Sequence, residues 1–262
     1  MISVTSAQLD LWLAAFIFPL ARIGGLMMAA PVLSNAAVPQ RIRLVWSLVV
    51  TLALAPALPP MPAVPAGSWV GLAILAQQML IGVLLGFTLR IVFTAIDVAG
   101  QLIGLQMGLS FAVFYDPINA SQTPVVAEFL SLLTTLLFLA MNGHLLIFSA
   151  LAESFKILPV STAPLAANGI AVMLSWSATI FIAGLLLSLP LVAALLIANI
   201  AMGVLTRVAP QLNLFAIGFP VTLAAGFMVI LVSLPYFGAA MEKLFDQGFT
   251  AMAMVMRAGA GG

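Results

Sequence analysis

The sequence is almost without charge. Eight Lys and Arg and seven Asp and Glu side chains occur in 262 residues, whereas 64% of the residues are hydrophobic. An ordinary globular domain carries about 25% charged residues, and a soluble chain this apolar would expose large adhesive patches. Helices are the structures that satisfy their own backbone hydrogen bonds in lipid. We therefore predict an all-α integral membrane protein.

Cysteine is absent and histidine occurs once. A chain without cysteine has no disulfide, no thiolate nucleophile and no thiolate metal cluster. The formal net charge of +1 gives no basic patch for nucleic acid, so we expect no nucleic-acid partner. Residues 1–10 lack the positive charge of a cleaved signal peptide. We expect the first apolar stretch to be retained.

Six apolar stretches divide the chain, at residues 11–33, 44–58, 69–89, 127–151, 170–205 and 214–240. A membrane-spanning helix needs about 20 apolar residues, so a chain of this length holds about five to seven. The second stretch is short for a span, and the fifth is too long for one straight crossing. Pro190 near the middle of the fifth predicts a bend or a pair of helices there.

Proline-rich and polar residues mark linkers at 31–39, 56–65 and 159–168. Lys and Arg in short loops favour the cytoplasmic side. Arg41 and Arg43 therefore predict a cytoplasmic turn, and the chargeless loop 59–68 is expected on the opposite side. The N-terminus would then lie outside.

Residues 90–128 mix apolar and polar side chains and resemble neither a clean span nor a clean loop. Gly100, Gly104 and Gly108 recur every four residues there. This spacing lines one helical face with bare backbone and permits the close approach of another helix. We predict a helix-packing role for these glycines rather than a functional one.

The segment 108–117 reads Gly-Leu-Ser-Phe-Ala-Val-Phe-Tyr-Asp-Pro and carries three rings, Phe111, Phe114 and Tyr115. Irregular backbone at membrane depth is tolerated where protein buries it or where it lines a cavity. A narrow apolar constriction excludes water and blocks ions. The residues alone give equal weight to a pore seal and to a re-entrant loop that fills a gap in the core.

Four ionisable residues lie in or beside apolar stretches: Arg22, Asp97, Glu128 and Arg207. Such residues mark functional sites by default because isolated charge is costly in a membrane. Four charges of both signs also fit pairing between helices or subunits, and we favour this structural role. For His144, the single histidine, we favour a hydrogen-bonded structural role over a proton relay or metal ligand. We expect no metal site and no cofactor.

The C-terminal region changes pattern after residue 240. Leu244, Phe245 and Phe249 alternate with Glu242, Lys243 and Asp246, which predicts an amphipathic helix at an interface or on a partner. Residues 250–262 are expected to form a tail.

Several blocks resemble, in order, the FliR family of flagellar export-gate proteins. They are Leu-Gln-Met-Gly-Leu-Ser-Phe-Ala-Val-Phe-Tyr-Asp-Pro at 105–117, Met-Asn-Gly-His at 141–144 and Arg-Val-Ala-Pro-Gln-Leu-Asn-Leu-Phe-Ala-Ile-Gly-Phe-Pro at 207–220. Shorter blocks at 4–6, 30–34 and 38–43 extend the likeness to the N-terminus. The resemblance covers the chain to about Phe249.

The resemblance implies a multi-pass subunit of the type III export gate in the bacterial inner membrane, at the flagellar basal body. It would form a helical pore complex with FliP and FliQ, meet FlhB at its cytoplasmic face, and pass unfolded flagellar proteins. It would not be an enzyme. The implied architecture is a FliP-like region at residues 1–169, a FliQ-like hairpin at 170–249 and the tail at 250–262.

The resemblance also implies that the segment 108–117 is a channel plug. The plug residues carried over to this sequence are Ser110, Phe111, Val113, Phe114, Tyr115, Asp116 and Pro117. The alternatives are a virulence type III secretion homologue and, less favoured, a small-solute secondary transporter with Asp97 and Arg22 at its site. An intramembrane enzyme is the third.

Overall fold

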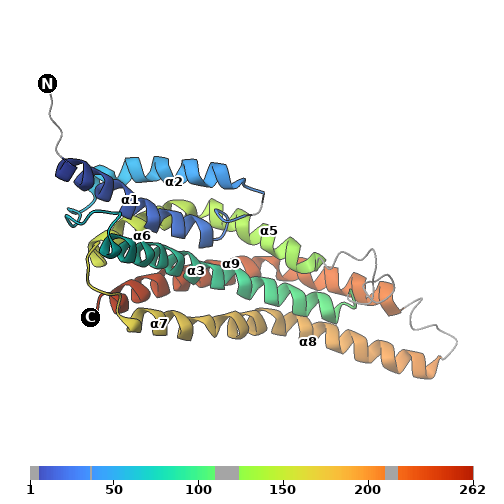
Figure 1. Ribbon diagram of the computed structural model, residues 1–262. Coiled ribbons are helices and arrows are strands. Elements are labelled where there is room, and N and C mark those ends of the chain that lie inside the picture. The colour runs from blue at the N-terminus through green and yellow to red at the C-terminus, as the bar shows by residue number, and fades with distance from the viewer. Residues whose placement is uncertain (1–5, 36, 110–123, 210–217, 262) are drawn as a thin grey trace. The chain divides into compact units, whose positions relative to one another are not determined.

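The computed structural model describes residues 6–35, 37–109, 124–209 and 218–261 (Figure 1). Over these ranges the chain forms helices and no strand, as predicted for an all-α membrane protein. The elements are α1 (Ser6–Ala29), α2 (Gln40–Leu54), the 3-10 helix η1 (Ala55–Ala57), α3 (Trp69–Gln106), α5 (Val125–Ala140), α6 (Gly143–Ile157), α7 (Ala167–Ser177), α8 (Thr179–Val208) and α9 (Phe219–Gly259).

The described helices are long enough for a multi-pass protein. Four helical stretches have the length and apolar composition to cross a membrane: Asp10–Ala29, Trp69–Gln106, Ala167–Val208 and Phe219–Gly259. The pair α5 and α6 makes a fifth if it is counted as one span broken between Ala140 and Gly143. At this break Asn142 adopts left-handed backbone with φ 57°, a conformation that Asn tolerates better than most residues.

Helix α3 extends well beyond the apolar stretch from which it was predicted. The sequence predicted an end near residue 89, but the helix continues through Arg90 and Asp97 to Gln106. No proline interrupts residues 69–106. The buried positions after residue 90 recur at helical spacing, and they include Ile91, Val92, Ala95, Ile96, Ala99 and Ile103. Burial of this stripe maintains the helix where a charge suggested its end.

The long fifth stretch breaks at Ala178, between α7 and α8, and not at Pro190, which lies inside α8. The reason lies in the serines before the break. Ser175 Oγ donates to the Val172 carbonyl at 2.8 Å and Ser177 Oγ to the Leu174 carbonyl at 2.6 Å. Such bonds compete with the helical ladder and bend or end helices.

The C-terminal residues 250–262, predicted as a tail, instead continue α9 to Gly259. The side chains of Met252, Val255 and Met256 are buried. Alanine and methionine are strong helix formers, so both propensity and burial extend the helix. Residues 250–259 of the predicted tail therefore belong to α9.

The chain divides into two compact units. Unit 1 comprises Met1–Ile91, Asn142–Ser177 and Asp246–Gly262, and unit 2 comprises Val92–Met141 and Ala178–Phe245. The helices α3 and α9 each contribute residues to both units. These units interleave along the chain, whereas the FliP-like region (residues 1–169) and the FliQ-like hairpin (residues 170–249) were predicted as consecutive ranges. That likeness stays a prediction.

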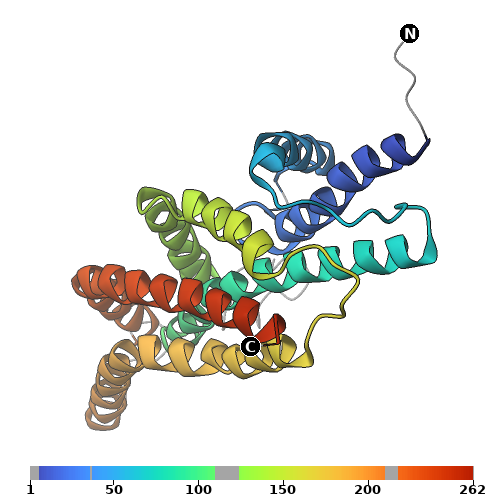
Figure 2. The same cartoon turned by 90° about the vertical axis from the view of Figure 1, so that its left-hand side faces the viewer.

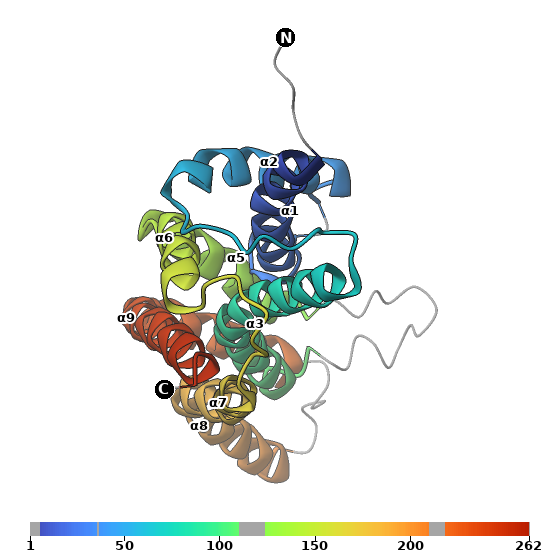
Figure 3. The ribbon, with the colours of Figure 1, turned by 60° about the vertical axis from the view of Figure 1, so that its left-hand side comes forward.

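Unit 1 begins with the hairpin of α1 and α2, which lie side by side (Figure 2, Figure 3). Ser47 and Thr51 are the buried side chains of α2. Their hydroxyls donate to the carbonyls of Arg43 at 2.8 Å and of Ser47 at 2.6 Å. These internal bonds satisfy both hydroxyls, so small polar residues can face inward.

Glycines hold α1 against α3 in unit 1. A side chain at Gly25 would overlap the carbonyl oxygen of Met79, and one at Gly82 would lie 2.8 Å from the Leu26 backbone nitrogen. A side chain at Gly86 would lie 2.6 Å from the Ala30 nitrogen. The two helices therefore touch backbone to backbone, which is how close packing is achieved between membrane helices.

Aromatic rings form the centre of unit 2. Phe93 of α3, Phe138 of α5 and Phe245 of α9 contact one another, with ring centroids 5.6, 5.5 and 5.2 Å apart. Edge-on and tilted arrangements at these distances are favourable. Beside them, Thr134 Oγ1 donates to the Leu130 carbonyl at 2.6 Å and lies 3.5 Å from Met241 Sδ. The rings tie three helices together.

Candidate functional site

The predicted plug residues, Ser110 to Pro117, lie outside the described residues. The structure does describe the two ends between which they run. One is the C-terminal end of α3 at residues 100–109, and the other is residues 124–127 at the start of α5. Both belong to unit 2. We call these two ends the segment base.

A Schellman motif ends α3 at the segment base. Gly108 has left-handed backbone with φ 81°. Its N–H donates to the Leu105 carbonyl at 3.0 Å, and the Leu109 N–H donates to the Gly104 carbonyl at 3.1 Å. This pair of bonds satisfies carbonyls that a helix end would leave unpaired, and glycine adopts the required conformation without steric cost. Helix α3 therefore ends at Gln106, four residues before Ser110, with Gly108 shaping its cap.

The same end of α3 rests on the first turn of α5. A side chain at Gly100 would lie 2.8 Å from the Ala127 nitrogen and 2.9 Å from the Ala127 Cβ. At Gly104 it would lie 3.7 Å from Val126, an ordinary van der Waals distance. Helix α5 begins directly after Pro124, and proline at a helix start is pre-organised for that position. The two ends of the segment are thus held against each other.

Two further helices of unit 2 contact the segment base. Asn199 Nδ2 of α8 donates to the Gln106 carbonyl at 3.4 Å. A side chain at Gly226 of α9 would lie 2.6 Å from the Met107 Cγ. Sequence reasoning missed both residues, although Asn199 is the one Asn or Gln in the apolar α8. Such a lone amide in a membrane helix is a usable signal for a polar contact between helices.

The three evenly spaced glycines therefore have three different surroundings. Gly100 allows close backbone contact, Gly104 lies at ordinary distance from its neighbours, and Gly108 falls after the end of α3 and shapes its cap. The spacing predicted one continuous packing face. The structure limits close packing to Gly100 because the helix ends before the third position.

The four predicted charges lie on four different helices, α1, α3, α5 and α8. Arg22 is fully buried in unit 1 and donates to Gln78, Ser154 and Leu158, which are neutral acceptors. Asp97 lies half-buried in unit 2. Glu128 is exposed in the first turn of α5, and Arg207 is exposed in the last turn of α8. Both of these charges complement their helix dipoles.

His144 lies half-buried in the first turn of α6. Its Nδ1 is buried without a hydrogen-bond partner in the described part of the chain. No group of three or more His, Cys, Asp or Glu side chains able to hold a metal occurs among those same residues. The hydrogen bond predicted for His144 is therefore not made by Nδ1 within the described residues.

Comparison with known proteins identifies relatives over nearly the whole chain. The family profile described as "Bacterial export proteins, family 1" matches residues 13–248. The chain is 42% identical to the flagellar biosynthetic protein FliR of Escherichia coli (strain K12), over 98% of both chains. It is 41% identical to FliR of Pectobacterium carotovorum subsp. carotovorum, again over 98% of both. Identity to FliR of Caulobacter vibrioides is 32%, over 86% of this chain and 89% of that protein.

Proposed function

Because the chain belongs to family 1 of the bacterial export proteins and is a FliR-type component of flagellar export, we propose that it forms a protein-conducting path with FliP and FliQ. It is a multi-pass inner-membrane protein, which we place at the flagellar basal body. Unfolded flagellar proteins would pass through the path, and FlhB would meet its cytoplasmic face. It would act without a catalytic step or cofactor.

The observation that carries this proposal is the extent of the similarity. Identity of 42% over 98% of both chains includes the segment 108–117 and the helices on either side of it. A relative that shared only hydropathy would not match in this continuous way. The role proposed for this chain is therefore inferred from its similarity to the flagellar proteins named FliR.

Within the conduit, we assign the seal to the segment 108–117. The rings of Phe111, Phe114 and Tyr115 would exclude water from a narrow passage, and a dewetted passage blocks ions without a charged filter. The geometry of the segment base supports this assignment, since both ends of the segment are fixed on packed helices.

The seal is tested by replacing Phe111, Phe114 and Tyr115 with alanine in the full chain, expressed with its export partners. We expect the assembled gate to leak ions, measured as conductance of the purified complex in planar bilayers. Tyr236→Ala is the control, because it removes an exposed ring of α9. Unchanged conductance of an assembled triple variant would remove the seal assignment.

The partners are tested by purification. A tagged chain produced together with FliP and FliQ should recover both in constant ratio, whereas the chain produced alone should aggregate in detergent. A transporter would instead be stable alone and take up solute. Isolation of a well-behaved monomer with uptake activity would reject the export-gate proposal.

A further inference from the structure

Arg22 carries a buried charge that the proposed conduit does not use. Its side chain is fully buried, and a guanidinium group has five N–H donors and stays protonated in proteins. Nε donates to Gln78 Oε1 at 2.8 Å, and Nη2 also donates to that oxygen. Nη1 donates to the carbonyl and hydroxyl of Ser154 at 2.8 and 3.1 Å, and Nη2 to the Leu158 carbonyl at 2.7 Å.

The acceptors of Arg22 show what balances its charge. Ser154 lies in the last turn of α6, and Leu158 is the residue at which that helix ends. The last carbonyls of a helix lack partners within the helix and form the negative end of its dipole. The Phe155 ring adds a cation–π contact, with the guanidinium carbon 4.1 Å from its centroid. Arg22 of α1 thus caps the C-terminal end of α6.

The turn that follows α6 is fastened at two more points. Gln77, the residue before Gln78, donates from its Nε2 to the Ala163 carbonyl at 3.0 Å. The Ala166 N–H donates to the carbonyl of Gly259, in the last turn of α9, at 3.1 Å. The turn 158–166 therefore accepts hydrogen bonds from α1 and α3 and donates one to α9, all within unit 1.

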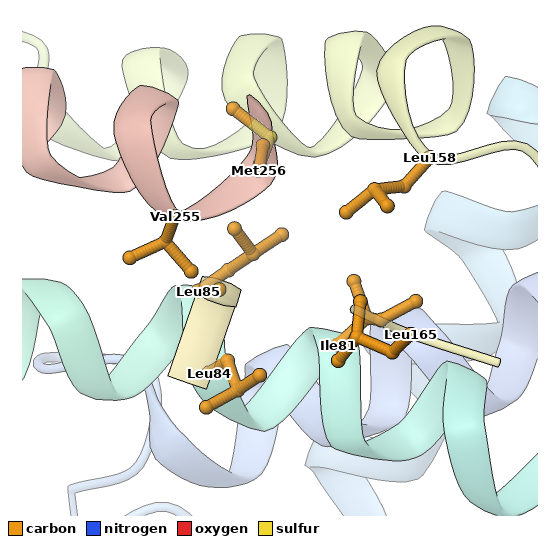
Figure 4. Close-up of a pocket in the computed structure, with 8 residues that line it drawn as sticks. Ile81, Leu84, Leu85, Leu158, Leu165, Val255 and Met256 are labelled. Carbon is orange, nitrogen blue, oxygen red and sulfur yellow. The ribbon is translucent and has the colours of Figure 1, made fainter. Parts of the chain in front are cut away.

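The side chains of this turn also meet α9. Leu158 and Leu165 line a small apolar pocket with Val255 and Met256 of α9, over Ile81, Leu84 and Leu85 of α3 (Figure 4). A side chain at Gly259 would lie 2.9 Å from Leu165 Cδ1. Leu158 therefore connects the Arg22 cap to the contact with α9, since its carbonyl binds Arg22 while its side chain packs against α9.

We propose that Arg22 is a positioning residue, which caps α6 and thereby fixes the turn 158–166 as the seat for the last turn of α9. Without the guanidinium, the Ser154 carbonyl would keep only its bond from the Leu158 N–H, and the Leu158 carbonyl would lose the bond from Nη2 in an apolar environment, where an unpaired polar group is costly. The end of α6 would then rearrange, and the seat would move with it. This role of Arg22 concerns the fold of unit 1 and does not rest on the proposed export role.

The absence of cysteine from the chain allows a direct test by crosslinking. The pair Leu165→Cys and Gly259→Cys reports on the seat, because the side chain built at Gly259 points at Leu165. The pair Met107→Cys and Gly226→Cys reports on unit 2, where a side chain at Gly226 would lie 2.6 Å from the Met107 Cγ. Both pairs are oxidised in membranes that contain the full chain with its partners.

Arg22→Met keeps the length and apolar stem but removes all donors. We expect disulfide formation at the seat to slow by about ten-fold, since the three charge-assisted bonds to Ser154 and Leu158 are lost, and to stay unchanged in unit 2. Arg22→Lys keeps the charge and three donors, so it should restore part of the rate. An unchanged rate at the seat in Arg22→Met overturns the inference.

Arg22→Met could abolish both the seat crosslink and the unit 2 crosslink, which would mean that the whole chain has unfolded. In that case Arg22→Lys is the variant that tests the inference. Slower crosslinking at the seat alone in Arg22→Lys then supports the inference. An unchanged seat, or loss of both pairs in Arg22→Lys as well, overturns it, because neither result is local to the end of α6. Flagellar protein export in the same cells is scored separately, so failure of the export proposal leaves this result intact.

Discussion

The two units hold their helices together in different ways. In unit 1, α1 and α3 touch through glycine backbones, and the centre is polar, formed by Arg22, Gln78 and Ser154. In unit 2, the centre consists of the rings of Phe93, Phe138 and Phe245. One helix, α3, supplies Gln78 to the first and Phe93 to the second.

The difference concerns how specific each arrangement is. Lipid tails are as apolar as the helices, so helix association in a membrane depends on packing and on polar contacts. A guanidinium with five satisfied donors permits one geometry, since each misplaced acceptor leaves a donor unpaired. A ring cluster tolerates small shifts because dispersion contacts are non-directional. We infer that directional hydrogen bonds set the helix positions in unit 1, whereas the packed volume of the three rings holds the helices together in unit 2.

The largest effect should come from removing bulk in unit 2. Phe138 is 1% exposed and contacts both other rings. Phe138→Ala should therefore lower the free energy of unfolding by about 3–5 kcal/mol, because it leaves a cavity between three helices. The measurement is SDS-induced unfolding, in mixed micelles, of the chain purified together with FliP and FliQ, followed by tryptophan fluorescence.

Phe129→Ala is the matched control, because this ring lies on the same helix and is 43% exposed. It should change the free energy of unfolding by no more than about 0.5 kcal/mol. Equal losses in the two variants would show that unit 2 is not centred on the ring cluster, and the contrast between the units would fail.

The second effect tests backbone contact in unit 1 with two consecutive glycines. A side chain at Gly25 would overlap the Met79 carbonyl and lie 3.1 Å from the Val83 nitrogen, whereas Gly24 has no atom within 4 Å. Gly25→Ala should cost about 1–3 kcal/mol, as overpacking does. Gly24→Ala should be neutral or stabilise by up to about 1 kcal/mol, because alanine favours the helix. Similar unfolding curves for both variants would contradict direct backbone contact at the α1–α3 crossing.

Hydropathy predicted the class of this protein and most of its helices, because long apolar stretches in a membrane have few alternatives to a helix. It failed where charge lies inside a helix. Arg90 and Asp97 suggested an end to a span, yet α3 continues past both. It predicted a bend or a pair of helices in the fifth stretch, and the stretch does form two helices, but hydropathy gave no sign that they divide at Ala178.

The partners of Arg22 were not predictable from local pattern. Sequence reasoning marked the residue as a buried charge and expected pairing between charges. Its acceptors lie 56, 132 and 136 residues away, at Gln78, Ser154 and Leu158, and two of them include backbone carbonyls. Every residue has a backbone carbonyl, so the residue type does not show which carbonyls accept a bond from Arg22. The glycine spacing at 100, 104 and 108 failed for a related reason, since equal intervals do not tell where a helix ends.

The smallest effect distinguishes the glycines of the segment base, which the sequence treated as equivalent. Gly100→Ala should cost about 1–2 kcal/mol, less than Gly25→Ala, because Ala127 lies in the first turn of α5 and helix ends fray more readily than helix interiors. Gly104→Ala should cost nothing, since its side chain would meet Val126 at 3.7 Å and alanine favours the helix. Both are measured by SDS unfolding. Equal losses would mean that α3 and α5 remain closely packed through position 104.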